Sequence, residues 1–193
     1  VYNTSGSYYL DNDVWEGSKG RVTWERVGFG KDNIFADIPG FYYMRFDRAQ
    51  LEVDSVMFTN IDFLSKSLMG KLRDRASSAD QITKEVLLNS AFPQFTSYDK
   101  NVELGSYLDN TVKFRGGYAM KGTEIIATGS AKDPSIVEIY YKTKPRVIAM
   151  SDYFSLKQNK ITAKSAEVVI KTDSGEIYHP KLIFNLNLEN KML

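Results

Sequence analysis

The side chains that most often carry enzyme chemistry are scarce in this sequence. It contains one histidine, His179, and no cysteine among its 193 residues. A lone imidazole with no second histidine and no thiolate lacks the ligands that zinc and related metals take. His179 stands before Pro180, and we interpret it as a turn residue rather than an acid–base catalyst or a metal ligand. The sequence therefore predicts no metal and no cofactor.

Sequence motifs of the common catalytic and nucleotide-binding loops are missing. The chain has neither the Gly-x-Ser-x-Gly turn of serine hydrolases nor a glycine-rich phosphate loop. Two carboxylates about 5–10 Å apart suffice for glycoside hydrolysis. The acidic candidates for such a pair are Glu25, Glu52, Asp54, Glu138 and Glu167. Most of them fall on the polar side of alternating segments, so we expect solvent-facing charges and no catalytic activity. A glycoside-active enzyme fragment is the third interpretation.

Aromatic residues are the main candidates for ligand contact. The chain has 12 Tyr, 11 Phe and 2 Trp, and exposed flat rings are suited to stacking on sugars. In a strand, the neighbours Tyr42 and Tyr43 point to opposite faces, so one of the two rings lies outside the core unless both faces are covered. The residues that we expect to bind a glycan are Trp15, Trp24, Tyr9 and Tyr42. The competing interpretation is an aromatic ladder that supports a sheet.

Charge and hydropathy limit the partners. Lys and Arg total 25 against 24 for Asp and Glu, so the sequence predicts no nucleic-acid partner and no anionic membrane surface. The apolar runs, such as residues 147–150, are far shorter than the roughly 20 residues of a membrane-spanning helix. We expect no transmembrane segment. We interpret the chain, which starts at Val1, as a segment excised from a longer polypeptide.

The elements that must position these residues are predicted to be strands. Polar and apolar residues alternate with period two in residues 48–54, 164–170 and 182–188, as a half-buried strand requires. Shorter strands are expected at residues 21–27, 34–38, 41–46, 135–141, 146–150 and 153–156. Turns are expected at residues 39–40, 144–145, 158–159 and 173–175. The predicted fold is all-β, with elongated antiparallel sheets of the sandwich or jellyroll type.

One short helix is the exception to this pattern. Residues 77–88 place Ala79, Ile82 and Val86 on one helical face, and Ser78 with Gln81 resembles a capping box. Helix and irregular chain are both compatible with this segment. In either case we interpret residues 77–92 as a connector between two β units.

The two β units are predicted at residues 1–76 and 93–193. Residues 6–12 (GSYYLDN) reappear as residues 105–110 (GSYLDN), and residues 49–53 match residues 166–170 more loosely. Two diverged copies stacked on each other are one explanation. Chance similarity between turn-rich β segments is the other.

Three segments resemble a family of very long, uncharacterised, β-rich cell-envelope proteins of Bacteroidota. They are residues 95–100 (FTSYDK), 114–122 (FRGGYAMKG) and 177–180 (IYHP). The resemblance implies an extracytoplasmic location, in the periplasm or at the cell surface, and carries no functional residue over to this chain. Residues 161–166 (ITAKSA) are also similar, more weakly, to the β-jellyroll modules that transport lipopolysaccharide.

The predicted function is a non-catalytic structural or interaction module of a larger bacterial envelope protein. Its partners would be the rest of that polypeptide and a protein or glycan surface. The alternatives are a carbohydrate-binding module that uses exposed Trp and Tyr, and a lipid-transport segment. The sequence leaves open whether the inner sheet faces form a filled core or an open trough.

Overall fold

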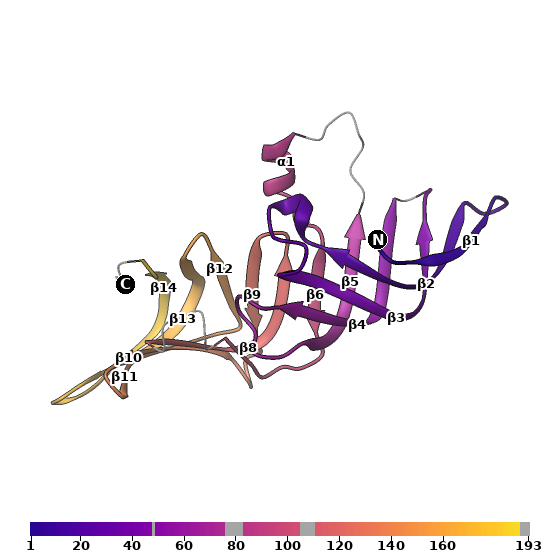
Figure 1. Ribbon diagram of the computed structural model, residues 1–193. Coiled ribbons are helices and arrows are strands. Elements are labelled where there is room, and N and C mark those ends of the chain that lie inside the picture. The colour runs from indigo at the N-terminus through magenta and orange to yellow at the C-terminus, as the bar shows by residue number, and fades with distance from the viewer. Residues whose placement is uncertain (48, 76–82, 105–110, 190–193) are drawn as a thin grey trace. The chain divides into compact units, whose positions relative to one another are not determined.

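The computed structural model describes residues 1–47, 49–75, 83–104 and 111–189 (Figure 1). Strands make up 66% of the structure and helix only 4%. The strands whose residue-by-residue register is defined pair in antiparallel fashion. The prediction of an all-β chain with little helix is therefore confirmed. No helix among the described ranges is long and apolar enough to cross a membrane.

The chain forms two compact units. Unit 1 comprises residues 1–61, 66–98 and 120–123, and unit 2 comprises residues 62–65, 99–119 and 124–193. The first unit therefore extends past the predicted connector. The reason is the strand Gln94–Ser97 (β6), which pairs with Leu68–Arg75 (β5) and so completes the sheet of unit 1.

The strands of unit 1 follow one another in a meander. They are β1 (Ser5–Tyr9), β2 (Val14–Thr23), β3 (Ile34–Arg45), β4 (Gln50–Asn60), β5 (Leu68–Arg75) and β6 (Gln94–Ser97). Each strand pairs with the next one in the sequence, so β1 is an edge strand (Figure 1). A 3-10 turn, η1 (Glu25–Val27), follows β2 where the sequence predicts that the strand continues to residue 27. The predicted strands 34–38 and 41–46 are one continuous strand, β3.

Alternation builds the core of unit 1. Buried residues occupy every second position of β4 up to Val53, and again from Val56 to Asn60. Three buried rings meet at the centre: Phe58 stacks on Phe95 with centroids 4.2 Å apart, and Trp24 meets Phe58 edge-on at 5.1 Å. Burial of such rings is the main source of stability in a core of this kind.

The described helix of unit 1 lies at the C-terminal end of the predicted segment 77–88. It spans Lys84–Leu88 (α1), and the Thr83 hydroxyl accepts a hydrogen bond from the Val86 amide at 3.2 Å. The N-cap is therefore Thr83. The predicted capping box at Ser78 and Gln81 lies outside the described residues.

Unit 2 contains the remaining strands. They are β7 (Val102–Leu104), β8 (Val112–Lys121), β9 (Glu124–Thr128), β10 (Ser135–Tyr141), β11 (Lys144–Ser151), β12 (Tyr153–Lys157), β13 (Lys160–Thr172) and β14 (Gly175–Asn187). The pairings β8–β10, β10–β11, β11–β13, β13–β12, β12–β9 and β9–β8 form a closed circuit. The circuit closes because β11 and β12, on either side of Asp152, pair with different halves of β13.

The turns and core of unit 2 follow from local sequence. Gln158 and Asn159 have φ of 50° and 58° and join β12 to β13 at the predicted position, as a two-residue hairpin turn requires. The predicted turn at residues 144–145 is wrong, because both residues lie in β11 and the chain reverses just before them. In the core, Phe154 meets Phe114 and Phe184 edge-on at 6.2 and 5.7 Å.

The two units share one structural feature, a bulged hairpin. In β4–β5, the four residues 53–56 face the three residues 70–72 of β5, and in β13–β14 the four residues 163–166 face the three residues 182–184 of β14. The buried and exposed positions also match, with two successive exposed residues at each bulge. This match aligns residues 50–60 with residues 160–170. The predicted correspondence of residues 49–53 with 166–170 therefore has the wrong register.

Candidate functional site

The candidate site is built on the outer face of the unit 1 sheet. Inward positions are set by the core residues Tyr42, Leu51 and Leu72, and successive side chains of a strand point to opposite faces. The residues next to them in sequence therefore point outward. We call the resulting band of side chains the outer strip.

Two neighbouring cross-strand rows make up the outer strip. The first row runs across five strands through Tyr9, Val14, Arg45, Gln50 and Arg75. The second contains Ser7, Glu16 and Tyr43 on β1 to β3, and Glu52, Arg73 and Gln94 on β4 to β6. Phe41 precedes Tyr43 by two positions on β3 and therefore points to the same face.

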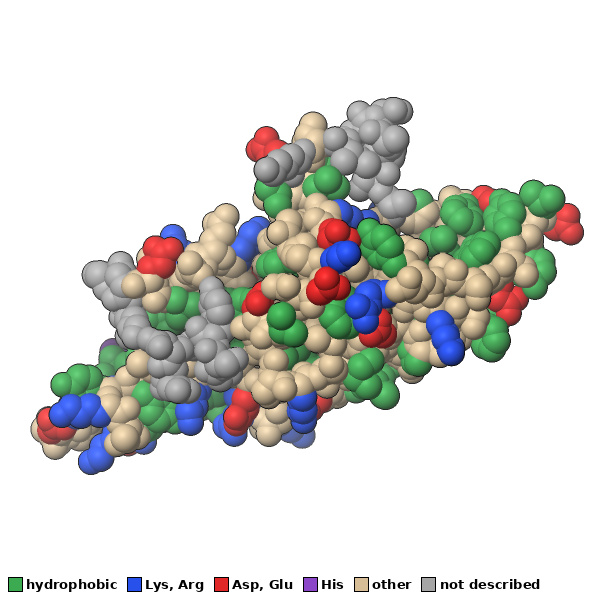
Figure 2. Space-filling model, in the orientation of Figure 1, with side chains coloured by type: hydrophobic (Ala, Val, Ile, Leu, Met, Phe, Trp, Pro, Cys, Tyr) green, Lys and Arg blue, Asp and Glu red, His purple; other side chains and the backbone are tan. Residues whose placement is uncertain are grey.

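The β1–β3 end of the outer strip is aromatic. The exposed fractions of Tyr9, Tyr43 and Phe41 are 48%, 59% and 73%. Glu16 lies directly opposite Tyr43, and its carboxylate accepts a hydrogen bond from the Tyr9 hydroxyl at 3.0 Å. This hydrogen bond raises the pKa of Tyr9, so the hydroxyl stays protonated at neutral pH. In Figure 2 hydrophobic side chains gather over β1 and β2.

The β4–β6 end of the outer strip is polar and concave. A pocket of about 480 Å³ is lined by Gln50, Arg73, Arg75, Phe92 and Gln94. Arg73 forms an ion pair with Glu52 at 3.2 Å, and Arg45 forms one with Asp47 at the same distance. Two amides and two guanidinium groups beside an aromatic ring can bind hydroxyl and acidic groups.

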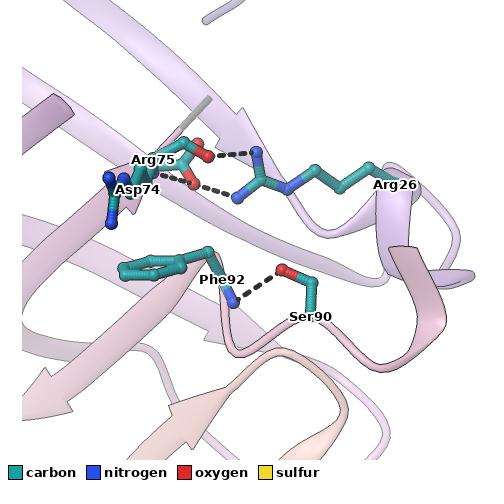
Figure 3. A network of polar contacts seen from close by, with 5 residues as sticks. All are labelled: Arg26, Asp74, Arg75, Ser90 and Phe92. Carbon is teal, nitrogen blue, oxygen red and sulfur yellow. Dashed lines mark hydrogen bonds and ion pairs between the residues drawn. The ribbon is translucent and has the colours of Figure 1, made fainter. Parts of the chain in front are cut away.

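A network of polar contacts fixes the backbone behind this pocket (Figure 3). Arg26, the middle residue of η1, forms an ion pair with Asp74 and donates a hydrogen bond to the Arg75 carbonyl at 3.0 Å. The Arg75 amide donates to Asp74 at 2.8 Å, and the Phe92 amide donates to the Ser90 hydroxyl at 3.1 Å. Burial raises the pKa of Asp74, which the charge of Arg26 partly offsets. The network fixes both ends of the pocket wall.

The structure changes the set of predicted glycan-binding residues. Tyr9 lies on the outer strip. The expectation that Trp24 and Tyr42 are exposed is wrong, because their exposed fractions are 0% and 3%. Trp24 packs on Phe58 in the core, and Tyr42 lies over Gly17, where its ring occupies the space of a side chain. Trp15 is half-buried and stands opposite Tyr8, on the other face from Glu16.

The outer-strip residues that the sequence interpretation missed have a detectable signal. Ile34, Ala36 and Ile38 are buried, and Tyr42 continues their even-numbered phase. Reading residues 34–45 as one strand would have placed Tyr42 inside and Tyr43 outside. Likewise, the even-numbered residues 68, 70 and 72 of β5 are buried, so the odd-numbered Arg73 and Arg75 point outward. Residues 68–75 were not among the predicted strands.

The carboxylates considered for catalysis are each engaged with a nearby side chain. Glu52 and Asp54 form ion pairs with Arg73 and Lys71. The remaining three bond to tyrosine hydroxyls: Glu25 to Tyr2 at 2.9 Å, Glu138 to Tyr140 at 3.0 Å and Glu167 to Tyr178 at 3.1 Å. These contacts are typical of charged residues that stabilise a sheet surface.

His179 and a second concave region offer no comparable set of groups. His179 lies within β14 at an irregularity of the β13–β14 register rather than in a turn. The second pocket, of about 360 Å³, includes Tyr2, Arg21 and Glu25 in its lining. These groups are bonded to each other or to neighbours, as in the two hydrogen bonds from Arg21 to Asp37 at 2.7 and 2.9 Å.

Within the described residues, no three His, Cys, Asp or Glu side chains are grouped so as to hold a metal ion. The outer strip is therefore the candidate site, with rings at one end and a polar pocket at the other. A scan against protein-family models and searches of curated proteins and of solved structures found no match to this chain.

Proposed function

We propose that this chain is a non-catalytic carbohydrate-binding module and that the outer strip of unit 1 is its contact surface. The observation that carries the proposal is the group of three exposed rings, Tyr9, Tyr43 and Phe41, around Glu16. Exposed apolar surface is costly in water, and a group of such residues marks a binding surface.

The arrangement of these rings suits a chain of sugars. Neighbouring strands of a sheet are about 4.8 Å apart, so rings on β1 and β3 are separated by about twice that distance. The apolar face of a pyranose stacks on an aromatic ring, while its hydroxyls need hydrogen-bonding partners. Glu16 between the rings and Gln50 further along the outer strip supply such partners.

Two further observations support a binding role. Both carboxylates of the second row already have partners: Glu16 accepts a hydrogen bond from Tyr9, and Glu52 forms an ion pair with Arg73. Hydrolysis of a glycosidic bond needs two carboxylates that are free to act on the substrate. The inner faces hold fully buried rings, such as Phe58 and Phe95 in unit 1 and Phe154 in unit 2. Packed inner faces favour a surface site over a lipid trough.

The proposed module is part of a longer envelope polypeptide and acts outside the cytoplasm. The resemblance of residues 95–100, 114–122 and 177–180 to β-rich envelope proteins supports this location. Interaction through a surface, with no reaction step, also fits a module whose role is to hold a larger protein against a glycan.

The test is binding of the purified chain to a glycan array, followed by calorimetry with the best ligand. We expect Tyr43→Ala and Tyr9→Ala each to weaken binding about tenfold, because each removes one stacking ring. Tyr178→Ala is the matched control, since Tyr178 is also exposed and also donates to a glutamate, Glu167 at 3.1 Å. Absence of binding to any glycan, or an equal loss in the control, would contradict the proposal.

A further inference from the structure

The polar end of the outer strip differs from the aromatic end in its charge balance. Three arginines lie on β3 and β5 of this face, and two of them are neutralised: Arg45 by Asp47 and Arg73 by Glu52. Arg75 is exposed, and no described carboxylate lies within ion-pair distance of its guanidinium. The pocket therefore has one cation available for a ligand.

The surroundings of Arg75 fit an acidic group. Gln50 stands directly opposite it on β4, and Gln94 stands opposite Arg73 on β6, so two amides flank the arginines of the pocket. A guanidinium presents parallel N–H groups that bind two oxygens of a carboxylate or sulfate at once. Phe92 adds an apolar wall, as expected of a small-molecule site with few polar groups.

The backbone of Arg75 is held in place independently of any ligand. Its amide donates to Asp74 at 2.8 Å, and its carbonyl accepts from Arg26 at 3.0 Å. Both contacts use main-chain atoms of Arg75, so the side chain is left to project from the outer face. Fixed support of this kind reduces the ordering cost of binding.

We propose that the pocket around Arg75 binds the acidic group of an anionic sugar, a carboxylate or a sulfate ester, within the glycan that occupies the outer strip. This inference rests on the proposed carbohydrate-binding function and adds the charge class of the ligand. The rings would hold the sugar faces, and Arg75 with Gln50 and Gln94 would select for acidic residues.

The experiment compares probes that differ in charge. Calorimetry on the whole chain uses oligogalacturonate, its methyl ester and a sulfated carrageenan oligosaccharide. We expect at least one acidic probe to bind about tenfold more tightly than the neutral ester, with an advantage that shrinks as salt is raised. The acidic probe that binds identifies whether the group is a carboxylate or a sulfate.

Variants separate this inference from the proposed function. Arg75→Gln should remove the preference for acidic probes without weakening the neutral ester, and Arg75→Lys should restore part of it. Arg115→Gln, which changes an exposed arginine of β8 in unit 2, should leave all three affinities unchanged. Circular dichroism checks that each variant is folded.

The possible results have distinct meanings. Equal affinity for acidic and neutral probes, or an unchanged preference in Arg75→Gln, would overturn the inference and leave the carbohydrate proposal standing. Failure of every probe and of the glycan array would overturn both.

Discussion

The matched hairpins β4–β5 and β13–β14 show which positions maintain the fold and which are free to vary. Their buried positions and their bulges coincide, yet their outward residues differ. In unit 1, Glu52 faces Arg73 and Asp54 pairs with Lys71 at 2.8 Å, whereas in unit 2 Thr162 faces Asn185. Inward positions maintain the sheet, so the specialised chemistry of unit 1 resides on its outer face.

One inward position breaks the match. Leu51 faces Asp74 in unit 1, and at the equivalent place in unit 2 Ile161 faces Leu186, which is fully buried. Unit 1 thus has an ion pair to Arg26 where unit 2 has an apolar contact. Buried ion pairs add little stability over well-packed apolar groups, which favours a positioning role for Asp74 behind the pocket.

The largest expected effect concerns the shared core positions. Leu72 and Phe184 are equivalent inward residues, and both are buried. We expect Leu72→Ala to lower the free energy of unfolding by about 2–5 kcal/mol and Phe184→Ala by about 3–5 kcal/mol, because each leaves a cavity. Urea denaturation of the natural chain and of each variant measures this change in the free energy of unfolding. A loss well below 1 kcal/mol in either variant would show that the inward positions are not equivalent.

The second effect concerns the mismatched position. Asp74→Ala should lower the free energy of unfolding by about 3 kcal/mol, since it leaves the partly buried Arg26 without its carboxylate partner. The double variant Asp74→Leu with Arg26→Met, which imitates unit 2, should lie within about 1 kcal/mol of the natural chain. The free energies come from the same denaturation experiment. A double variant as unstable as the single one would show that the ion pair itself stabilises unit 1.

Asp74 also predicts a pH dependence. Burial raises the pKa of Asp74 above its ordinary value, so over the interval between the two values the native chain holds more protons than the unfolded chain. The free energy of unfolding therefore falls as pH rises through this interval, from about pH 4 upward. Asp74→Asn lacks this contribution, so the stability of the natural chain relative to the variant should fall over the same range. A relative rise with pH would mean that attraction to Arg26 outweighs burial.

The smallest effect is expected on the outer face. The side chains of Arg73 and Glu52 are 56% and 48% exposed, and exposed ion pairs contribute less than about 1 kcal/mol. Glu52→Gln should therefore leave the thermal midpoint almost unchanged. A large drop would show that the outer strip is needed for folding and would remove the contrast between inward and outward positions.

Much of the fold could be predicted from local patterns, and the site largely could not. The sequence predicted residues 135–141 as a strand with the observed bounds, and Gln158-Asn159 as a turn. The boundary between the two units was harder to predict, because β6 belongs to unit 1 through its pairing with β5 and its four residues carry no sequence signal of that pairing. The choice of Tyr42 over Tyr43 failed because β3 was split at Pro39-Gly40, which broke the phase that assigns each ring to a face.

The most direct test of the account is glycan binding by the Tyr9→Ala, Tyr43→Ala double variant, measured together with its thermal midpoint. The account predicts that the midpoint stays close to that of the natural chain while binding is lost, because these rings lie outside the core. Retained binding, or a collapse of the fold with the binding, would contradict it.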